Sequence, residues 1–169
     1  MSYIITANKY LLPSELEATR KIINNTNERD AVLLSVALAT GGRRCEVLEA
    51  LNTPSALLND ESIFLRGLKD SHDRAIPITS ELYARIKSLL KRDPSAFAIS
   101  TRRFNQIWDH HRPVSKPLHC LRHTFAIELY RKSRDIQLVA SALGHKNIAN
   151  TMVYMQLVHS AESLRKALL

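Results

Sequence analysis

Apolar and polar residues alternate along most of this chain with the period of an α-helix, so that side chains three or four apart face a common core. The stretch from Glu28 to Thr40 is apolar on nearly all sides, and we expect it to be the buried centre of the molecule. The pattern predicts a helix that begins at Pro13 and ends at Asn24-Asn27, and a second helix over 28–40. Gly41-Gly42 breaks the second helix, and a short helix follows through Leu51. Further helices are expected over 79–90, 101–111, 118–132, 136–143 and 148–158, with a helical tail over 160–169.

One part of the chain indicates β-structure instead. Short apolar runs at Ser62–Leu65 and Ala75–Ile78 flank the polar stretch from Gly67 to Arg74, which is typical of a hairpin with an extended loop. Internal repeats, low-complexity tracts and separating linkers are absent from the sequence. We therefore expect one domain over residues 1–169, mainly α with a small antiparallel β-sheet (α+β), in which residues 1–9 are an N-terminal extension.

Composition narrows the class of protein. With 169 residues, of which 45% are apolar, the chain can bury a core without disulfides or metals. Apolar runs such as Ala31–Ala39 are much shorter than the ~20 residues that span a membrane, and the N-terminus lacks the pattern of a secretory signal. Two cysteines, Cys45 and Cys120, form no disulfide framework. A protein of the reducing cytoplasm, without a membrane partner, fits these features best.

The distribution of charged residues along the chain indicates what kind of partner it binds. Residues 1–90 carry 11 basic and 11 acidic side chains, whereas residues 91–169 carry 13 and 5, so the second part supplies the whole net charge of +8. A polyanion such as nucleic acid is the natural partner of such a surface. A basic domain with a merely solvated face is the plainer alternative.

Three local patterns contain the residue types that handle phosphate. The first is Thr40-Gly41-Gly42-Arg43-Arg44-Cys45-Glu46, where a helix ends and a new one begins with an arginine at the turn. The second is His119-Cys120-Leu121-Arg122-His123, in which His119 and Arg122 share a helix face. The third is Leu143-Gly144-His145, followed nine residues later by Tyr154.

In this order the patterns resemble those of the tyrosine recombinase, or phage integrase, family: threonine-glycine-x-arginine-x-x-glutamate, histidine-x-leucine-arginine-histidine, and leucine-glycine-histidine with a later tyrosine. The resemblance covers about residues 10–169, and it implies the family's catalytic-domain fold. Carried over by position, it implies catalytic roles for Arg43, Lys69, His119, Arg122, His145 and Tyr154, and a supporting role for Glu46 as the buried partner of Arg43. The spacing from Thr40-Gly41 and to Glu46 selects Arg43 rather than the adjacent Arg44.

The chemistry of phosphodiesters explains these residue types. Attack on the phosphate builds negative charge on its non-bridging oxygens, and the guanidinium forks of Arg43 and Arg122 can hold that charge without a metal or another cofactor. Tyr154 resembles the nucleophile that forms a 3′-phosphotyrosine, and Lys69, on the hairpin, resembles the general acid for the departing 5′ oxygen. His119 and His145 are expected to position the phosphate and to assist proton transfer.

Each of these residues also has a structural explanation when it is taken alone. An arginine at a helix start or a hairpin lysine is usually solvated, and a lone histidine or a tyrosine on an apolar helix usually packs in the core. The hairpin loop also departs from the family, because it contains the acidic residues Asp70 and Asp73. It is the joint occurrence of the patterns in one order that favours the catalytic interpretation.

The resemblance implies a site-specific recombinase or integrase that cleaves and rejoins double-stranded DNA, works as a homotetramer and is associated with the nucleoid when bound. The tail over 160–169 is expected to pack either on a neighbouring protomer or on its own core. Family members usually carry an N-terminal helical clamp domain for which we expect no room here, which leaves a catalytic fragment or a minimal enzyme, and an accessory DNA-binding protein as an additional partner. The alternatives are a DNA-binding or regulatory module with the same fold and a relaxing enzyme similar to type IB topoisomerases.

Overall fold

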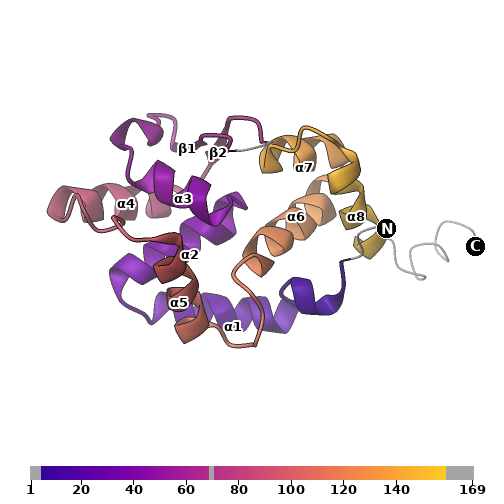
Figure 1. Ribbon diagram of the computed structural model, residues 1–169, viewed down its shortest axis with the longest axis horizontal. Coiled ribbons are helices and arrows are strands. Elements are labelled where there is room, and N and C mark those ends of the chain that lie inside the picture. The colour runs from indigo at the N-terminus through magenta and orange to yellow at the C-terminus, as the bar shows by residue number, and fades with distance from the viewer. Residues whose placement is uncertain (1–4, 69–70, 159–169) are drawn as a thin grey trace, which may run out of the picture.

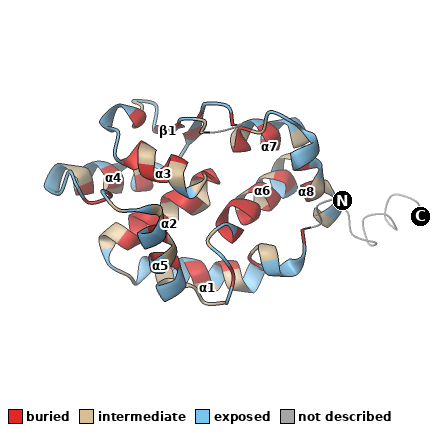
Figure 2. Cartoon of the chain, in the orientation of Figure 1, coloured by how far each residue is buried: buried red, intermediate tan, exposed pale blue. Residues whose placement is uncertain are grey.

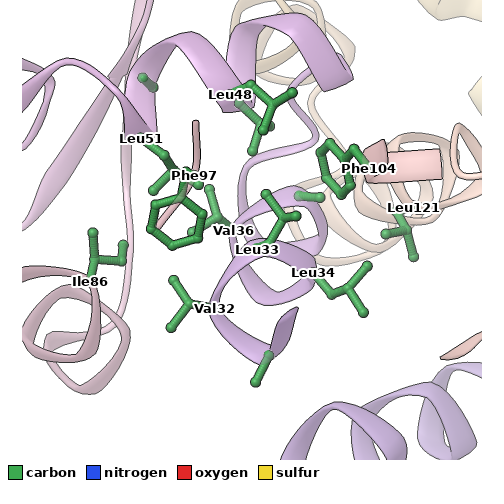
Figure 3. Close-up of a cluster of buried hydrophobic side chains, with 14 of the residues drawn as sticks. Val32, Leu33, Leu34, Val36, Leu48, Leu51, Ile86, Phe97, Phe104 and Leu121 are labelled. Carbon is green, nitrogen blue, oxygen red and sulfur yellow. The ribbon is translucent and has the colours of Figure 1, made fainter. Parts of the chain in front are cut away.

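The computed structural model describes residues 5–68 and 71–158, and its centre is helix α2 (Glu28–Thr40). The Asn27 side chain caps this helix by accepting a hydrogen bond from the Asp30 backbone nitrogen (3.0 Å). Most of the residues of α2 are buried, as the run of apolar residues predicted. Figure 3 shows the side chains that surround it, which come from distant parts of the chain: Leu48, Leu51, Ile86, Phe97, Phe104 and Leu121.

The other elements are arranged around α2 as Figure 1 shows. They are η1 (Ala7–Lys9), α1 (Pro13–Asn24), α3 (Arg44–Leu51), η2 (Pro54–Ala56), β1 (Ser62–Leu65), β2 (Arg74–Pro77), α4 (Ser80–Arg92), α5 (Thr101–His111), α6 (Cys120–Ser133), α7 (Ile136–Leu143) and α8 (Ala149–Val158). Helices α1, α3, α4 and α6 all contact α2, whereas α7 and α8 pack on α6. Figure 2 shows that buried residues follow α2 and the inner faces of its neighbours.

The expected fold class, mainly α with one small antiparallel sheet, is confirmed. The two strands pair in the register Ser62 with Pro77 and Leu65 with Arg74. The second strand therefore begins one residue earlier than predicted, at Arg74, because this arginine turns inward and is buried. The predicted tail over 160–169 lies outside the described residues. In the described part of the chain, no helix is both long enough and apolar enough to cross a membrane.

The apolar core has two parts. The larger cluster surrounds α2, and a smaller cluster joins α6, α7 and α8 through residues such as Ile127, Tyr130, Val139 and Leu143. Each fully buried side chain of this size stabilises the fold by ~1.5–3 kcal/mol. The two clusters hold the ends of α2, α6 and α7 at one place, where the three sequence patterns meet.

Candidate active site

The first pattern forms a tight turn between α2 and α3. Gly41 ends α2 with a φ of +60°, and a Cβ added there would lie 2.3 Å from the ring of Phe125. Only glycine satisfies both the left-handed backbone and the close approach. The turn sets Arg43 at the start of α3, where its backbone nitrogen donates to Glu46 Oε2 (2.8 Å).

Glu46 is fully buried and binds two arginines. Arg74 approaches it with both ends of its fork, at 2.8 Å from Nη2 to Oε2 and 3.3 Å from Nη1 to Oε1. Arg43 Nη1 donates to Oε1 at 3.3 Å, and Arg122 Nη1 lies 4.0 Å from Oε2. Burial opposes ionisation of the carboxyl, but hydrogen bonds from Arg74 and the Arg43 backbone outweigh it and lower the pKa of Glu46. A permanent carboxylate thus orients the cations around it.

Arg122, from the second pattern, is buried and held by main-chain carbonyls. Its Nη1 donates to the Gly41 oxygen (2.7 Å) and its Nη2 to the Leu143 oxygen (2.9 Å). Burial and the charge of Arg43 lower the pKa of Arg122 to about 10, so the guanidinium stays charged at neutral pH. The arginine therefore joins the ends of α2 and α7 and brings a fixed positive charge between them.

His145, from the third pattern, lies against Arg122. Arg122 Nη2 donates to His145 Nε2 (3.1 Å), and because that nitrogen accepts, the other ring nitrogen of a neutral His145 carries the proton and donates to Thr151 Oγ1 (2.8 Å). Burial and the nearby arginines lower the pKa of His145 to about 4. The imidazole is therefore neutral at pH 7, with its orientation set by a buried threonine.

Tyr154 is buried on α8 and faces α6. Its hydroxyl lies 2.9 Å from Nδ1 of His123, and the two rings are tilted by 51° with centroids 5.8 Å apart. His119 lies one helical turn before His123, and the rings of these two histidines form a T-shaped pair with centroids 4.7 Å apart. Tyr154 is also close enough to Arg122 for a phenolate charge there to raise the arginine's pKa.

An open cleft of about 720 Å³ lies between α3, α5 and the start of α6. Its walls include Arg43, Arg44, Arg112, His119 and Arg122. His119 is exposed along this cleft, and desolvation by the cleft wall together with the charges of Arg122, Arg43 and Arg44 lowers its pKa to about 4. A hollow lined by fixed cations and a neutral histidine is suited to an anion such as a phosphodiester.

The end of the hairpin loop closes one side of this cluster. The Ser71 hydroxyl accepts a hydrogen bond from Arg43 Nη1, and Ser71 pairs with His145 as an isolated β-bridge. The His72 backbone nitrogen also donates to the Gly144 oxygen (2.9 Å). Lys69, the predicted general acid in this loop, lies outside the described residues.

The structure thus brings together five of the predicted catalytic residues and the supporting glutamate: Arg43, Glu46, His119, Arg122, His145 and Tyr154. Sequence reasoning missed three side chains that hold them, namely Arg74, His123 and Thr151. The sequence contains a signal for His123, because this residue lies four residues after His119 and so shares its helix face. It contains none for Arg74, since its partner Glu46 is 28 residues away, and none for Thr151, since a threonine six residues after His145 belongs to no recognised pattern. Within residues 5–68 and 71–158, no group of three or more His, Cys, Asp or Glu side chains is arranged to hold a metal.

Fold and site together define a mainly helical domain with a cationic, tyrosine-bearing centre. The family model of the phage integrase family matches residues 9–160, and the chain therefore belongs to this family. Its sequence is 30% identical to the tyrosine recombinase XerA of Pyrococcus horikoshii, in an alignment that covers 92% of this chain and 62% of that protein. The chain spans less than two thirds of the length of the curated relatives that it matches first.

Solved structures agree on the fold. The crystal structure of XerA recombinase superimposes with a TM-score of 0.74 at 23% identity, over 98% of this chain and 63% of that one. XerH site-specific recombinase, bound to its difH substrate in a pre-cleavage complex, gives a TM-score of 0.68 at 23% identity, over 94% of this chain and 53% of that one. The expected recombinase catalytic-domain fold is confirmed.

Proposed function

We propose that this chain is the catalytic domain of a site-specific DNA recombinase, which cleaves and rejoins duplex DNA through a 3′-phosphotyrosine. The observation that carries the proposal is that Arg43 and Arg122, from separate parts of the chain, line one cationic cleft. His145 is hydrogen-bonded to Arg122, and Tyr154 is buried on α8 within electrostatic reach of Arg122. Family membership and the DNA substrate of the XerH complex support the choice of DNA as substrate.

In this proposal the two arginines bind the scissile phosphate. Arg43 is partly exposed at the cleft, and Arg122 presents a guanidinium whose position is fixed by two carbonyls. Charge that develops on the non-bridging oxygens during attack is therefore met by donors that need no rearrangement. Neutral His119 supplies a further hydrogen bond to a phosphate oxygen, and His145, held between Arg122 and Thr151, positions the phosphate through the Arg122 guanidinium.

Tyr154 supplies the nucleophile. Its oxygen attacks the phosphorus, the bond to the 5′ oxygen breaks, and the phosphotyrosine conserves the bond energy for rejoining. We assign protonation of the 5′ oxygen to Lys69 on the family resemblance alone. The reaction so written uses side chains of this protein and no metal or nucleotide cofactor.

Assembly belongs to the same proposal. We propose that four copies act together on two DNA duplexes, with the segment over 160–169 contacting a neighbouring copy, and that an accessory DNA-binding protein adds contacts to the duplex. Mass measurements of the protein–DNA complex, with and without residues 160–169, check this: loss of the tetramer on truncation is the expected result.

The experiment that tests the nucleophile uses Tyr154→Phe, which removes one oxygen and no charge. We expect the unmodified chain to form a denaturant-resistant adduct with a nicked suicide duplex and the variant to form none, while both bind the duplex with similar affinity. Electrophoresis of labelled DNA under denaturing conditions measures the adduct. An adduct that persists in the variant would contradict the role of Tyr154, and binding without any adduct in the unmodified chain favours a regulatory DNA-binding module instead.

A further inference from the structure

His123 is a buried histidine that the mechanism above leaves unused. We propose that its Nδ1 accepts the proton of the Tyr154 hydroxyl during cleavage and returns it during rejoining, so that His123 is the general base and acid of the nucleophile. The inference rests on the proposed function, because it assumes that Tyr154 is the attacking group.

The geometry of the pair supports proton transfer. His123 Nδ1 and the Tyr154 hydroxyl are 2.9 Å apart, which is within the range of a direct hydrogen bond. Both side chains are buried, with relative exposures of 6% and 3%. Contacts between α6 and α8 hold the two residues in place. A proton can therefore move along this bond without first crossing water.

The two other histidines of the site are less suited to this task. The Nε2 lone pair of His145 accepts from Arg122, and its Nδ1 proton is donated to Thr151, so both nitrogens are engaged. His119 is exposed along the cleft and meets the edge of the His123 ring. In the described part of the chain, His123 is the histidine whose nitrogen lies within hydrogen-bond distance of the Tyr154 hydroxyl.

Electrostatics couple the proton transfer to the presence of DNA. Burial, together with nearby positive charge, lowers the pKa of His123 to about 3, so its imidazole is neutral and able to accept a proton. The groups whose charge lowers it are His119, Arg122, Lys9 and His145. A phosphate bound to Arg122 brings a negative charge that offsets this field, which makes His123 more basic. Substrate in the cleft therefore raises the pKa of His123 by offsetting the part of the shift that comes from nearby charge.

The Tyr154 oxygen forms a bond to phosphorus as its proton moves to His123 Nδ1, and the bond from phosphorus to the 5′ oxygen breaks. That oxygen takes its proton from a separate acid. In rejoining, the 5′ hydroxyl gives its proton back to that separate acid as its oxygen attacks phosphorus, the phenolic oxygen leaves, and His123 returns the proton to the phenolic oxygen.

The kinetic test compares His123→Asn with His110→Asn. Asparagine keeps a hydrogen-bonding group near the Tyr154 hydroxyl but is not a base, and His110 is exposed on α5 and serves as the matched control. Single-turnover adduct formation on a suicide duplex should slow by about 10²-fold in His123→Asn and stay unchanged in His110→Asn. DNA affinity should stay the same in both variants, and a cooperative melting transition in each shows that the compared proteins are folded.

A more acidic phenol at position 154 tests whether His123 acts by accepting the proton or only by positioning the Tyr154 side chain. With 3,5-difluorotyrosine in place of Tyr154, the phenol ionises more readily, and we expect the His123→Asn variant to recover most of its rate. Failure of the fluorinated residue to restore the rate, or an unchanged rate in His123→Asn itself, overturns the inference and leaves the proposed function intact. A missing adduct in the unmodified chain overturns both.

A spectroscopic test needs no activity. In the ¹⁵N spectrum of the unmodified protein, Nδ1 of His123 should show the shift of an unprotonated, accepting nitrogen, and Tyr154→Phe should move that shift. A protonated Nδ1 would mean that His123 donates to the tyrosine oxygen, which overturns the proposal whether or not His123→Asn folds.

Discussion

At the scale of single residues, two adjacent arginines of the site differ in their contacts and in their exposure to solvent. Arg43 contacts both Glu46 and Ser71, whereas Arg44 is exposed on the first turn of α3. The side chain of Arg43 is therefore held in position at the cleft, whereas that of Arg44 is exposed to solvent.

We therefore expect Arg43→Ala to lower the rate of adduct formation by about 10²–10³-fold, since one oxyanion donor is worth that much. Arg44→Ala, the matched control, should change this rate much less. Single-turnover cleavage at saturating protein measures both variants. A larger loss in Arg44→Ala would mean that the family pattern is displaced by one residue in this chain.

Glu46 stabilises the folded protein as well as orienting the arginines around it. It is a buried carboxylate that satisfies Arg74 and Arg43 together, so its removal leaves buried positive charge uncompensated. We expect Glu46→Gln to lower the free energy of unfolding by ~3–5 kcal/mol. Glu49→Gln, which breaks only a 3.6 Å pair with the exposed Arg66, should cost ~0–1 kcal/mol. Urea unfolding compares the two, and equal losses would contradict the role assigned to Glu46.

At the scale of elements, the sequence was sufficient for the helices and for the hairpin. The predicted helix over 28–40 has the same bounds as α2, because Asn27 caps its start and Gly41 ends it. The helix predicted over 118–132 begins two residues later, at Cys120, since Pro117 and the turn after it delay the first helical residue. The 3-10 turns η1 and η2 were missed because they carry no periodic pattern.

The candidate site was predicted less completely than the fold. Six catalytic candidates could be named, five because they occur in patterns with fixed local spacing and Lys69 because of its place on the hairpin. Arg74 could not, because its partner Glu46 is 28 residues away and its carbonyl partner, Ala142, is 68 residues away. Contacts of that range follow from packing rather than from any local pattern.

The turn between α2 and α3 provides a prediction at this scale. Gly41→Ala introduces an L-residue at a φ of +60° and a Cβ against the Phe125 ring, so we expect a loss of ~2 kcal/mol or more in the free energy of unfolding. Ser35→Ala, on the same helix and half-buried, should have an effect within ~0.5 kcal/mol. Chemical denaturation measures both variants, and a Gly41→Ala protein as stable as Ser35→Ala would refute the constraint.

At the scale of the whole molecule, the chain is basic, and arginines from both parts of the sequence line one cleft. Four arginines line that cleft, and the chain beyond residue 90 carries the net charge of +8. DNA affinity should therefore depend on salt, with a slope of about −0.9 in log affinity for each phosphate neutralised.

The salt dependence can be assigned to a residue. If Arg44 contacts one phosphate, Arg44→Ala should reduce the slope by about 0.9. Arg131→Ala is the matched control, because Arg131 is exposed on α6 and paired with Glu128 (3.0 Å). Titrations of labelled duplex at several salt concentrations give the slopes, and equal slopes for both variants and the unmodified chain would remove Arg44 from the interface.

The two carbonyls that hold Arg122 bear on how far sequences of this kind can diverge. Every residue has a main-chain oxygen, so the acceptor at position 143 persists whatever side chain evolves there, whereas position 41 is restricted to glycine by its φ of +60° and by the Phe125 ring. An arginine anchored in this way tolerates drift in the residues around it as long as the helices end at the same points. Low sequence identity is thus compatible with a conserved position for this arginine, because the backbone path rather than the neighbouring side chains holds it.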